Sequence, residues 1–386
     1  MRISWTGSEN EACGYGSSAL NIVKALKAKK ISVNPKGEPP EIAVAYVPSG
    51  MGHIEKMPDV YRVLFTMFES TVWPREWVNG CNVANEVWVP SKWCKETLIA
   101  SGCEAPVNVV PLGIDPDVYY RDPFVDRRTE GTFVFGYVGA TSYRKGFDLL
   151  IRGFLEEFEG EDVRLNVLSS SMLSSDVPKH KQIHVTEGPV SEAEVRQFYY
   201  SLDAFVMPSR GEGFGLTPLE SMACGIVPIV TDYGGCRDYL GDWALRVAIQ
   251  GEEACDYMGG KGRWARPSVD SLRYCMRWAL EHRAEAHRMG ERATEIAAKR
   301  WTYARTAEVI EGLLKKIDPK QRIRTERVFG VTWHGSPRRV HTKLGRFTRG
   351  VFRGDVTPEQ LVKLNRSDLH PGGFEVEDRL RRVTEV

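Results

Sequence analysis

The segment between residues 204 and 230 constrains the fold of this chain more than any other. An apolar run at 204–207 is followed by a glycine-rich turn, a short helical stretch and a second apolar run at 226–230. Thr217 suits the N-cap of that helix, and Pro218 suits its first position. A strand, a helix and a strand within so few residues predict two parallel strands joined by a crossover helix.

Two carboxylates, Glu212 and Glu220, lie on either side of the predicted helix start, eight residues apart. Gly213 and Gly215 allow backbone N–H groups to approach a ligand closely, and a helix N-terminus favours a bound anion. We therefore expect a diphosphate at the helix start and sugar hydroxyls at the two carboxylates. The alternative is a buried strand–helix unit with two solvated glutamates, in which the glycines have no evident use.

The length of 386 residues exceeds one ordinary hydrophobic core and fits two domains of roughly 150–200 residues. Apolar residues make up 42% of the chain and charged residues 27%, as in soluble globular proteins. The formal net charge of +1 favours neither a nucleic acid nor a membrane as partner. Apolar runs are strand-sized, and a strand begins directly after Met1, so we expect neither a transmembrane helix nor a signal peptide. Eight scattered cysteines indicate reduced thiols and a cytoplasmic location.

Short apolar runs alternate with amphipathic stretches in two successive units, which indicates two parallel α/β sheets. A segment rich in Pro, Asp and Arg at about 113–131 separates the units as a linker. Strands are expected at 2–5, 41–47, 62–68, 86–90 and 107–112 in the first unit and at 133–139, 164–168, 182–185, 204–207, 227–231 and 244–247 in the second. Helices are expected at 15–29 and 91–101 in the first unit and at 147–158, 192–201, 268–283, 286–300 and 303–317 in the second.

Two features of the first unit place chemically useful residues at the ends of predicted strands. The turn Gly14-Tyr15-Gly16-Ser17 opens a helix, where it can hold a phosphate or let a sugar approach the backbone. A plain tight turn has the same sequence features. Glu69 ends another predicted strand, at the edge where parallel sheets bind ligands. A capping or solvated glutamate fits that place equally well.

In the second unit, Arg144 and Lys145 follow the strand expected at 133–139. Adjacent cations at a strand end can neutralise a departing diphosphate, because negative charge accumulates there when a sugar–phosphate bond breaks. The alternative interpretation is a solvated basic turn.

The run from Pro208 to Gly225, Pro-Ser-x-x-Glu-Gly-Phe-Gly-Leu-x-Pro-Leu-Glu-x-Met-Ala-x-Gly, resembles the retaining glycosyltransferases of family 4 (GT4). These enzymes carry Glu-x7-Glu in the second of two Rossmann-like domains. The resemblance covers about residues 1–318 and implies the α/β GT-B fold, in which the two domains face each other across a cleft. It implies an acceptor-side domain at 1–122 and a nucleotide-sugar-binding domain at 123–318. The basic C-terminal extension at 319–386 is expected to pack back on the first domain.

The resemblance also implies a role for the motif residues. Glu220 would accept hydrogen bonds from the nucleotide ribose, and Glu212 would hold hydroxyls of the donor sugar. Lys145, with Arg144, would stabilise the departing diphosphate. Glu69 lies roughly where other members carry a cleft-facing histidine, and we place it near the acceptor. The other donor-binding positions implied are Gly14, Gly16, Gly213, Phe214, Gly215, Leu216 and Thr217.

The sequence departs from the family at some positions. The arginine that usually follows the Val-Gly of the first strand of the second domain falls on Ala140, so either Arg144 substitutes for it or the activity is low. Asp238 replaces the glutamate of the family's Gly-Gly-x-x-Glu. Asp115-Pro116-Asp117 has the Asp-x-Asp form of metal-dependent glycosyltransferases. The resemblance instead implies transfer without a metal or another cofactor, with the nucleotide sugar as a co-substrate.

Positive charge is concentrated near the end of the chain. Between 319 and 353 there are ten Lys or Arg residues and one acid, Glu326. Basic and aromatic residues alternate there, a pattern that can bind a nucleic-acid backbone and stack bases, or lie on an anionic lipid surface. Packing across the first domain and disorder are the other interpretations. The candidate nucleic-acid residues are Arg338, Arg339, Lys343, Arg346 and Arg349.

Three functions follow from these observations. The leading one is a retaining, metal-independent glycosyltransferase that acts on a saccharide, lipid-linked or small-molecule hydroxyl. The second is a glycosyltransferase that acts on nucleic acid, such as a modified DNA base, and binds it through the basic extension. The third is a catalytically silent relative that binds a nucleotide or a polyanion. A nucleotide-sugar epimerase of the same fold, which needs no acceptor, is a related possibility.

Overall fold

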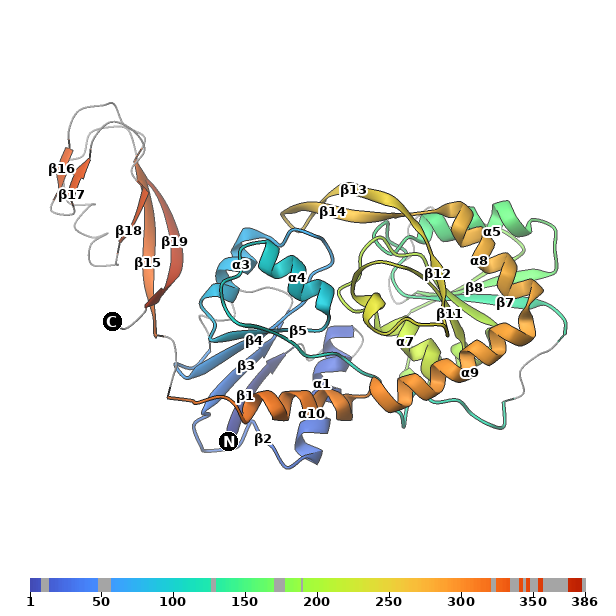
Figure 1. Cartoon of the computed structure of the whole chain (residues 1–386), viewed down its shortest axis with the longest axis horizontal. Helices are drawn as coiled ribbons and strands as arrows, with labels where there is room; N and C mark the ends of the chain where they lie inside the picture. The colour runs from blue at the N-terminus through green and yellow to red at the C-terminus, as the bar shows by residue number, and fades with distance from the viewer. Residues whose placement is uncertain are drawn as a thin grey trace.

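Two parallel six-stranded sheets, one from each half of the chain, form the framework of the protein (Figure 1). The computed structural model describes residues 1–7, 14–47, 57–125, 130–169, 178–188 and 190–320, and beyond them the backbone of strands between 324 and 383. The predicted α/β architecture with two Rossmann-like units is confirmed.

The first sheet has the strand order β2-β1-β3-β4-β5-β6. This order reverses between β1 and β3, and in open parallel sheets ligands bind at the carboxyl ends of the strands that flank such a reversal. Strand β2 and helix α3 have no counterpart among the predicted elements. The strands are β1 (Arg2–Gly7), β2 (Ser32–Val33), β3 (Ile42–Tyr46), β4 (Tyr61–Phe65), β5 (Glu86–Val89) and β6 (Val107–Val109), and the helices are α1 (Gly14–Ala28), α3 (Arg75–Asn82) and α4 (Lys92–Ala100).

The second sheet has the strand order β12-β11-β10-β7-β8-β9, which reverses between β7 and β10. Every residue of β10 and β11 is buried, as expected for central strands that helices cover on both faces. The strands are β7 (Phe133–Val138), β8 (Val163–Ser169), β9 (Ile183–Glu187), β10 (Ala204–Met207), β11 (Val227–Thr231) and β12 (Leu245–Val247). The helices are α5 (Phe147–Phe158), α6 (Glu192–Tyr200), α7 (Leu216–Ala223), the 3-10 turn η1 (Gly234–Asp238), α8 (Val269–Glu281) and α9 (Arg283–Arg300).

Helix α7 begins two residues earlier than the sequence analysis proposed. Its N-cap is Gly215, in the left-handed conformation with φ 84°, and no side chain caps the helix. Thr217 lies inside the first turn, where its hydroxyl contacts the Met207 sulfur at 3.5 Å. The prediction that Thr217 is the N-cap was therefore wrong, because a glycine supplies the positive φ that this entry into the helix requires.

Helix α10 (Tyr303–Leu314) was expected to close the second unit, but it packs against α1 of the first (Figure 1). The chain crosses between the halves at Ile114 and again at Thr302, where the two segments form a parallel bridge. The Ile114 N–H donates to the Trp301 carbonyl at 2.9 Å, and Lys29 of the α1 side pairs with Glu311 at 3.3 Å. One apolar core cluster therefore includes residues of both halves.

A β-hairpin that the sequence analysis did not predict leaves the second sheet after β12 and returns to α8. It consists of β13 (Ile249–Tyr257) and β14 (Gly260–Pro267), paired antiparallel. Its two turn residues, Met258 and Gly259, both have positive φ, the geometry of a tight two-residue hairpin turn. The hairpin extends toward the first half of the chain, beside α3 and α4 (Figure 1).

The end of the chain forms two small antiparallel sheets, whose side chains are not among those described. One consists of β15 (Arg324–Trp333), β18 (Arg353–Val356) and β19 (Phe374–Val383), and the other of β16 (Val340–Thr342) and β17 (Gly345–Phe347). The candidate residues Arg338, Arg339, Lys343 and Arg349 lie outside the described residues, and Arg346 is described only by its place in β17.

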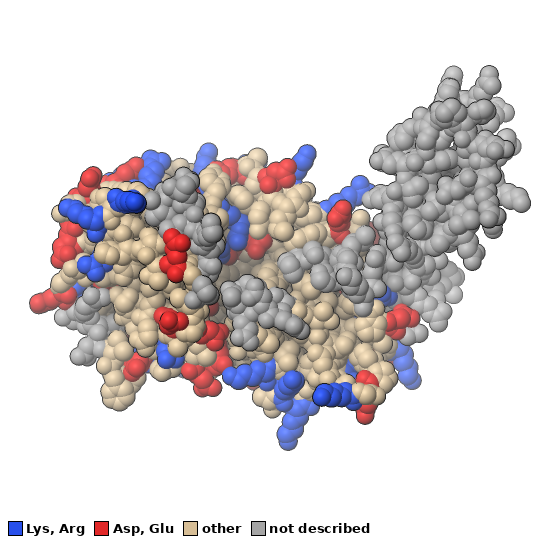
Figure 2. All heavy atoms as spheres, turned by 180° about the vertical axis from the view of Figure 1, so that it is seen from behind, with Lys and Arg blue, Asp and Glu red and all other residues tan. Residues whose placement is uncertain are grey.

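The surface of the described part is mixed in charge. On the face shown in Figure 2, Lys and Arg side chains are interspersed with Asp and Glu. None of the helices in the described ranges has the length and apolar character needed to span a membrane.

The crossing between the halves generates a prediction at Gly113. A Cβ added there would lie 2.3 Å from the backbone carbon of Thr302, and two backbone segments cannot separate without breaking the bridge. We expect Gly113→Ala to lower the free energy of unfolding by about 1–3 kcal/mol. Gly312→Ala is the matched control, because Gly312 lies in α10 with open space around it, and alanine there should raise stability slightly. Urea titration measures both; equal effects of the two substitutions would contradict the prediction.

Candidate functional site

The predicted cations and the first glutamate of the motif meet at the point where the second sheet reverses its strand order. Arg144 and Lys145 follow β7, Glu212 follows β10, and these two strands are neighbours. One carboxylate oxygen of Glu212 lies 2.7 Å from the Lys145 ammonium and 3.2 Å from Nη1 of Arg144. The sheet topology therefore joins residues that are almost seventy positions apart into one charged cluster.

Close backbone contact fixes the two loops that carry this cluster. Gly146 has φ 69°, and a Cβ added there would lie 1.9 Å from the Pro208 carbonyl oxygen. The Arg210 N–H donates to the Arg144 carbonyl at 2.7 Å, and the Arg210 guanidinium binds both carboxylate oxygens of Asp148 at 2.7 Å. Arg210 thus ties together the segments after β7 and β10.

The electrostatics keep the Glu212 carboxylate ionised. Burial alone would raise its pKa, but the ion pairs with Lys145 and Arg144 outweigh burial, so the pKa is lowered. The same carboxylate holds the pKa of Arg144 above its usual value against the effect of burial. A buried carboxylate that stays charged is a strong hydrogen-bond acceptor, which is what the hydroxyls of a sugar require.

Glu69 approaches this cluster from the first half of the chain. It follows β4, and a Cβ added to Gly211 would lie 2.2 Å from the Glu69 carbonyl oxygen, so the two backbones are in direct contact. Burial raises the pKa of Glu69; the Arg144 guanidinium opposes this shift and the Glu212 carboxylate adds to it. Glu69, Arg144, Lys145 and Glu212 are therefore electrostatically coupled.

The glycines of the motif differ in what they contact. Gly213 packs against the Met67 side chain, and its carbonyl accepts a hydrogen bond from the Ser91 hydroxyl at 2.7 Å. Gly213 thus mediates close contact between the two halves. Phe214 is buried and packs against Tyr239, which gives it a place in the core.

The starts of α1 and α7 lie close together. A Cβ added to Gly14, the first residue of α1, would be 3.7 Å from the side chain of Leu216, the first residue of α7. Gly215 precedes α7, and Gly16 and Thr217 lie in the first turns of the two helices. Two helix N-termini thus lie near each other, and their positive ends favour a bound anion.

Glu220 lies one turn into α7, and its carboxylate accepts a hydrogen bond from the Tyr199 hydroxyl at 2.9 Å. Burial raises the pKa of Glu220 to about 7; the Tyr199 hydrogen bond opposes this shift and the Glu192 carboxylate adds to it. Glu192 itself accepts a hydrogen bond from Ser17 of α1 at 3.0 Å. Tyr199 comes from α6, and no sequence pattern indicated that it would contact the motif.

The remaining predicted positions serve local structure. The carbonyl of Ala140, where the family has an arginine, accepts a hydrogen bond from the Tyr137 hydroxyl at 2.6 Å. Asp238 accepts a hydrogen bond from the Lys92 N–H at 2.8 Å, which is another contact between the halves. Asp115 pairs with Lys24 at 2.8 Å. Within the described ranges, no three His, Cys, Asp or Glu side chains gather closely enough to hold a metal ion.

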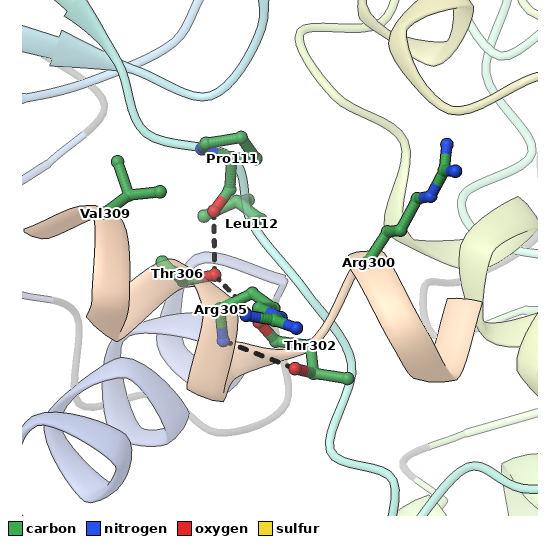
Figure 3. A pocket seen from close by; sticks show the side chains of 7 residues that line it. All are labelled: Pro111, Leu112, Arg300, Thr302, Arg305, Thr306 and Val309. Atoms are coloured by element: carbon green, nitrogen blue, oxygen red, sulfur yellow. Dashed lines mark hydrogen bonds between the residues drawn. The ribbon is translucent and has the colours of Figure 1, made fainter. Parts of the chain in front are cut away.

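A small pocket lies at the chain crossing and contains none of the predicted site residues (Figure 3). The Thr306 hydroxyl in its wall donates a hydrogen bond to the Pro111 carbonyl at 2.8 Å, so the pocket lies between the linker and α10. Its lining residues are Pro111, Leu112, Arg300, Thr302, Arg305, Thr306 and Val309.

The raised pKa of Glu220 predicts a pH-dependent stability. Its pKa is 4.5 ordinarily and about 7 in the folded chain, so the folded protein holds a proton that the unfolded chain releases between these values. The free energy of unfolding should therefore fall as the pH rises through about 7. Gln cannot ionise, so we expect Glu220→Gln to stabilise the protein at pH 8, by at most about 3 kcal/mol, and to have little effect at pH 5. Thermal unfolding of both proteins at the two pH values tests this; a pH-independent difference would contradict it.

The chain is similar in sequence and in fold to known glycosyltransferases. The family of glycosyl transferases group 1 matches residues 121–296. The chain is 27% identical over 172 residues to the lipopolysaccharide core biosynthesis mannosyltransferase LpcC of Rhizobium leguminosarum bv. viciae, covering 39% of this chain and 48% of that protein. It is 32% identical over 187 residues to a glycogen synthase of Granulibacter bethesdensis, covering 46% of this chain and 37% of that protein. The chain thus spans less than half the length of these curated relatives.

Solved structures show the same fold over a larger part of the chain. Sucrose-phosphate synthase from Thermosynechococcus elongatus superposes with a TM-score of 0.64 at 12% identity, covering 82% of this chain and 98% of that one. Anabaena HepE in complex with UDP-glucose superposes with a TM-score of 0.62 at 15% identity, covering 82% and 100%. The match to the group 1 glycosyl transferases thus covers residues 121–296, and the chain has the GT-B fold of two Rossmann-like units.

Proposed function

We propose that this chain transfers a sugar from a nucleotide-sugar donor to an acceptor hydroxyl, with retention of configuration and without a metal. The observation that carries the proposal is the cluster of Glu212, Lys145 and Arg144 at the strand-order reversal between β7 and β10. Ligands of open parallel sheets bind at such reversals. A buried carboxylate paired with two cations offers groups for both a sugar and a diphosphate.

The donor would lie along the start of α7. Its diphosphate would meet the amides of Gly215, Leu216 and Thr217, where the helix N-terminus favours negative charge. The ribose hydroxyls would donate to Glu220, which is one helical turn further along. The sugar would then extend toward Glu212. The lowered pKa of Glu212 keeps its carboxylate ionised, so that it can accept hydrogen bonds from the sugar hydroxyls.

The cations would stabilise the transition state. When the bond between the anomeric carbon and the diphosphate oxygen breaks, negative charge grows on that oxygen, and Lys145 with Arg144 would neutralise it. The acceptor oxygen would bond to the anomeric carbon on the same face, and its proton would pass to the departing phosphate. This route needs no protein nucleophile, so positioning and charge would supply most of the rate.

The acceptor would approach from the side of Glu69. This residue of the first half interacts electrostatically with Arg144, Glu212 and Lys145. A saccharide, lipid-linked or small-molecule hydroxyl fits this proposal. A nucleic-acid acceptor is the second candidate, favoured by the ten Lys or Arg residues between 319 and 353. DNA binding with a steep salt dependence, lost on removal of 319–386, would favour the second candidate over the first.

The donor proposal predicts ligand stabilisation. UDP-glucose, GDP-mannose and ADP-glucose should be tested by thermal unfolding, with and without EDTA. A ligand at 100 times its dissociation constant adds about 2.7 kcal/mol to the free energy of unfolding, so one donor should raise the melting temperature visibly. We expect the shift to persist in EDTA and to disappear in Glu220→Ala. If no donor shifts the melting temperature, the proposed donor site is wrong. Binding of a donor without turnover would favour a catalytically silent relative.

A substitution of Lys145 tests the role of the cations. Lys145→Ala removes one of the two positive charges held within 3.2 Å of Glu212, so we expect kcat to fall about 100-fold or more. Lys299→Ala is the matched control, since Lys299 also forms an ion pair, with Glu295 at 3.2 Å, but on the exposed face of α9. Donor turnover, measured as released nucleoside diphosphate, reports the effect. An unchanged kcat in Lys145→Ala would exclude the lysine from catalysis.

A further inference from the structure

The β13–β14 hairpin reaches from the second half of the chain to the segment of the first half that carries Glu69. The Trp264 indole N–H donates to the Glu69 carbonyl oxygen at 2.8 Å. The Arg263 N–H donates to the Thr71 hydroxyl at 2.8 Å, and the Thr71 N–H donates to the Arg263 carbonyl at 3.3 Å. Strand β14 is thus held to residues 69–71 by one backbone hydrogen bond and two hydrogen bonds that involve side chains.

Glycines allow this close fit. A Cβ added to Gly262 would lie 2.2 Å from the Ser70 hydroxyl, and one added to Gly260 would lie 2.4 Å from the Val72 carbonyl oxygen. The Tyr257 ring, at the hairpin tip, packs against Phe68 with ring centroids 5.4 Å apart. The hairpin therefore contacts each residue from 68 to 72 through backbone, hydroxyl or ring.

The same hairpin also contacts the donor side of the cluster. Tyr257 packs under the Arg144 guanidinium, 5.7 Å from the ring centroid, and Arg144 binds the Gly211 carbonyl at 2.6 Å and Glu212. Trp264 lies against Gly211, where an added Cβ would be 2.9 Å from the indole ring. One hairpin thus touches the segment before Glu212, the cation beside it, and the backbone of Glu69.

We propose that the β13–β14 hairpin is a positioning element for the transfer reaction. Its key residue is Trp264, whose hydrogen bond to the Glu69 carbonyl holds the Glu69 carboxylate in place beside Arg144 and Glu212. This inference rests on the proposed function. Trp264 acts through Glu69, so it governs how the acceptor hydroxyl or water meets the donor, and leaves donor affinity unchanged.

Trp264→Phe is the sharpest variant, because it keeps an aromatic side chain at this position while it removes the N–H donor and one ring of the indole. We expect faster hydrogen exchange of the amides of residues 69–72, and a kcat for hydrolysis of the best-binding nucleotide sugar about tenfold lower, with donor affinity unchanged. Trp243→Phe is the matched control, because its indole N–H also donates to a backbone carbonyl, that of Tyr239, at 3.1 Å in the same half of the chain. It should change neither quantity.

A double-mutant cycle with Glu69→Gln tests whether Trp264 acts through Glu69. We expect the loss of kcat caused by Trp264→Phe to disappear in the Glu69→Gln background, since coupled residues are not additive. Two results would overturn the positioning role while leaving the proposed function intact. One is unchanged hydrogen exchange at 69–72 in Trp264→Phe, and the other is the same roughly tenfold reduction of kcat by Trp264→Phe in the Glu69→Gln background. No binding of any nucleotide sugar to the unmodified protein overturns the proposed function itself.

Discussion

Direct contact between backbone segments at glycine positions is the constraint on which the site depends. Gly146 brings the loop after β7 against Pro208, and Gly211 brings the turn before Glu212 against Glu69. A Cβ added to Gly235 would lie 2.0 Å from the Gly213 carbonyl, so η1 approaches the same turn from the other side. Three strands of two sheets can deliver charged side chains to one place only because these segments pack without side chains between them.

This packing brings two carboxylates and two cations into one largely buried volume. Each charge would be costly to bury alone, and Glu212 is compensated by its ion pairs with Lys145 and Arg144. The same ion pairs also bear on the proposed function, because Lys145 and Arg144, which neutralise Glu212, are suited to neutralise a departing diphosphate. The second glutamate, Glu220, has no cation at hydrogen-bond distance among the ion pairs of the described residues, and this explains why its pKa is raised while that of Glu212 is lowered.

Local sequence patterns predicted most of the sheet strands and brought Glu212, Lys145 and Arg144 to the right sheet edge, because strand ends and turns are encoded within a few residues. Patterns of that range could not predict that α10 packs on α1, since helical periodicity specifies an apolar face and not its partner. They also missed the β13–β14 hairpin, because every residue of β13 is partly or fully exposed and two buried positions of β14, Gly260 and Gly262, carry no apolar side chain. Gly213 was assigned to ligand approach on its residue type, yet its neighbour is Met67 of the other half, a contact that only the tertiary arrangement determines.

The packing of α10 on α1 makes the first unit discontinuous along the chain. Its sheet is complete in sequence at Val109, but the helix that covers α1 ends only at Leu314. At a synthesis rate of about 5–20 residues per second, roughly 10–40 s separate the synthesis of Val109 from that of Leu314, and the whole second sheet is synthesised in this interval. The second unit is therefore complete in sequence before the first, which is the reverse of the order of their sheets along the chain.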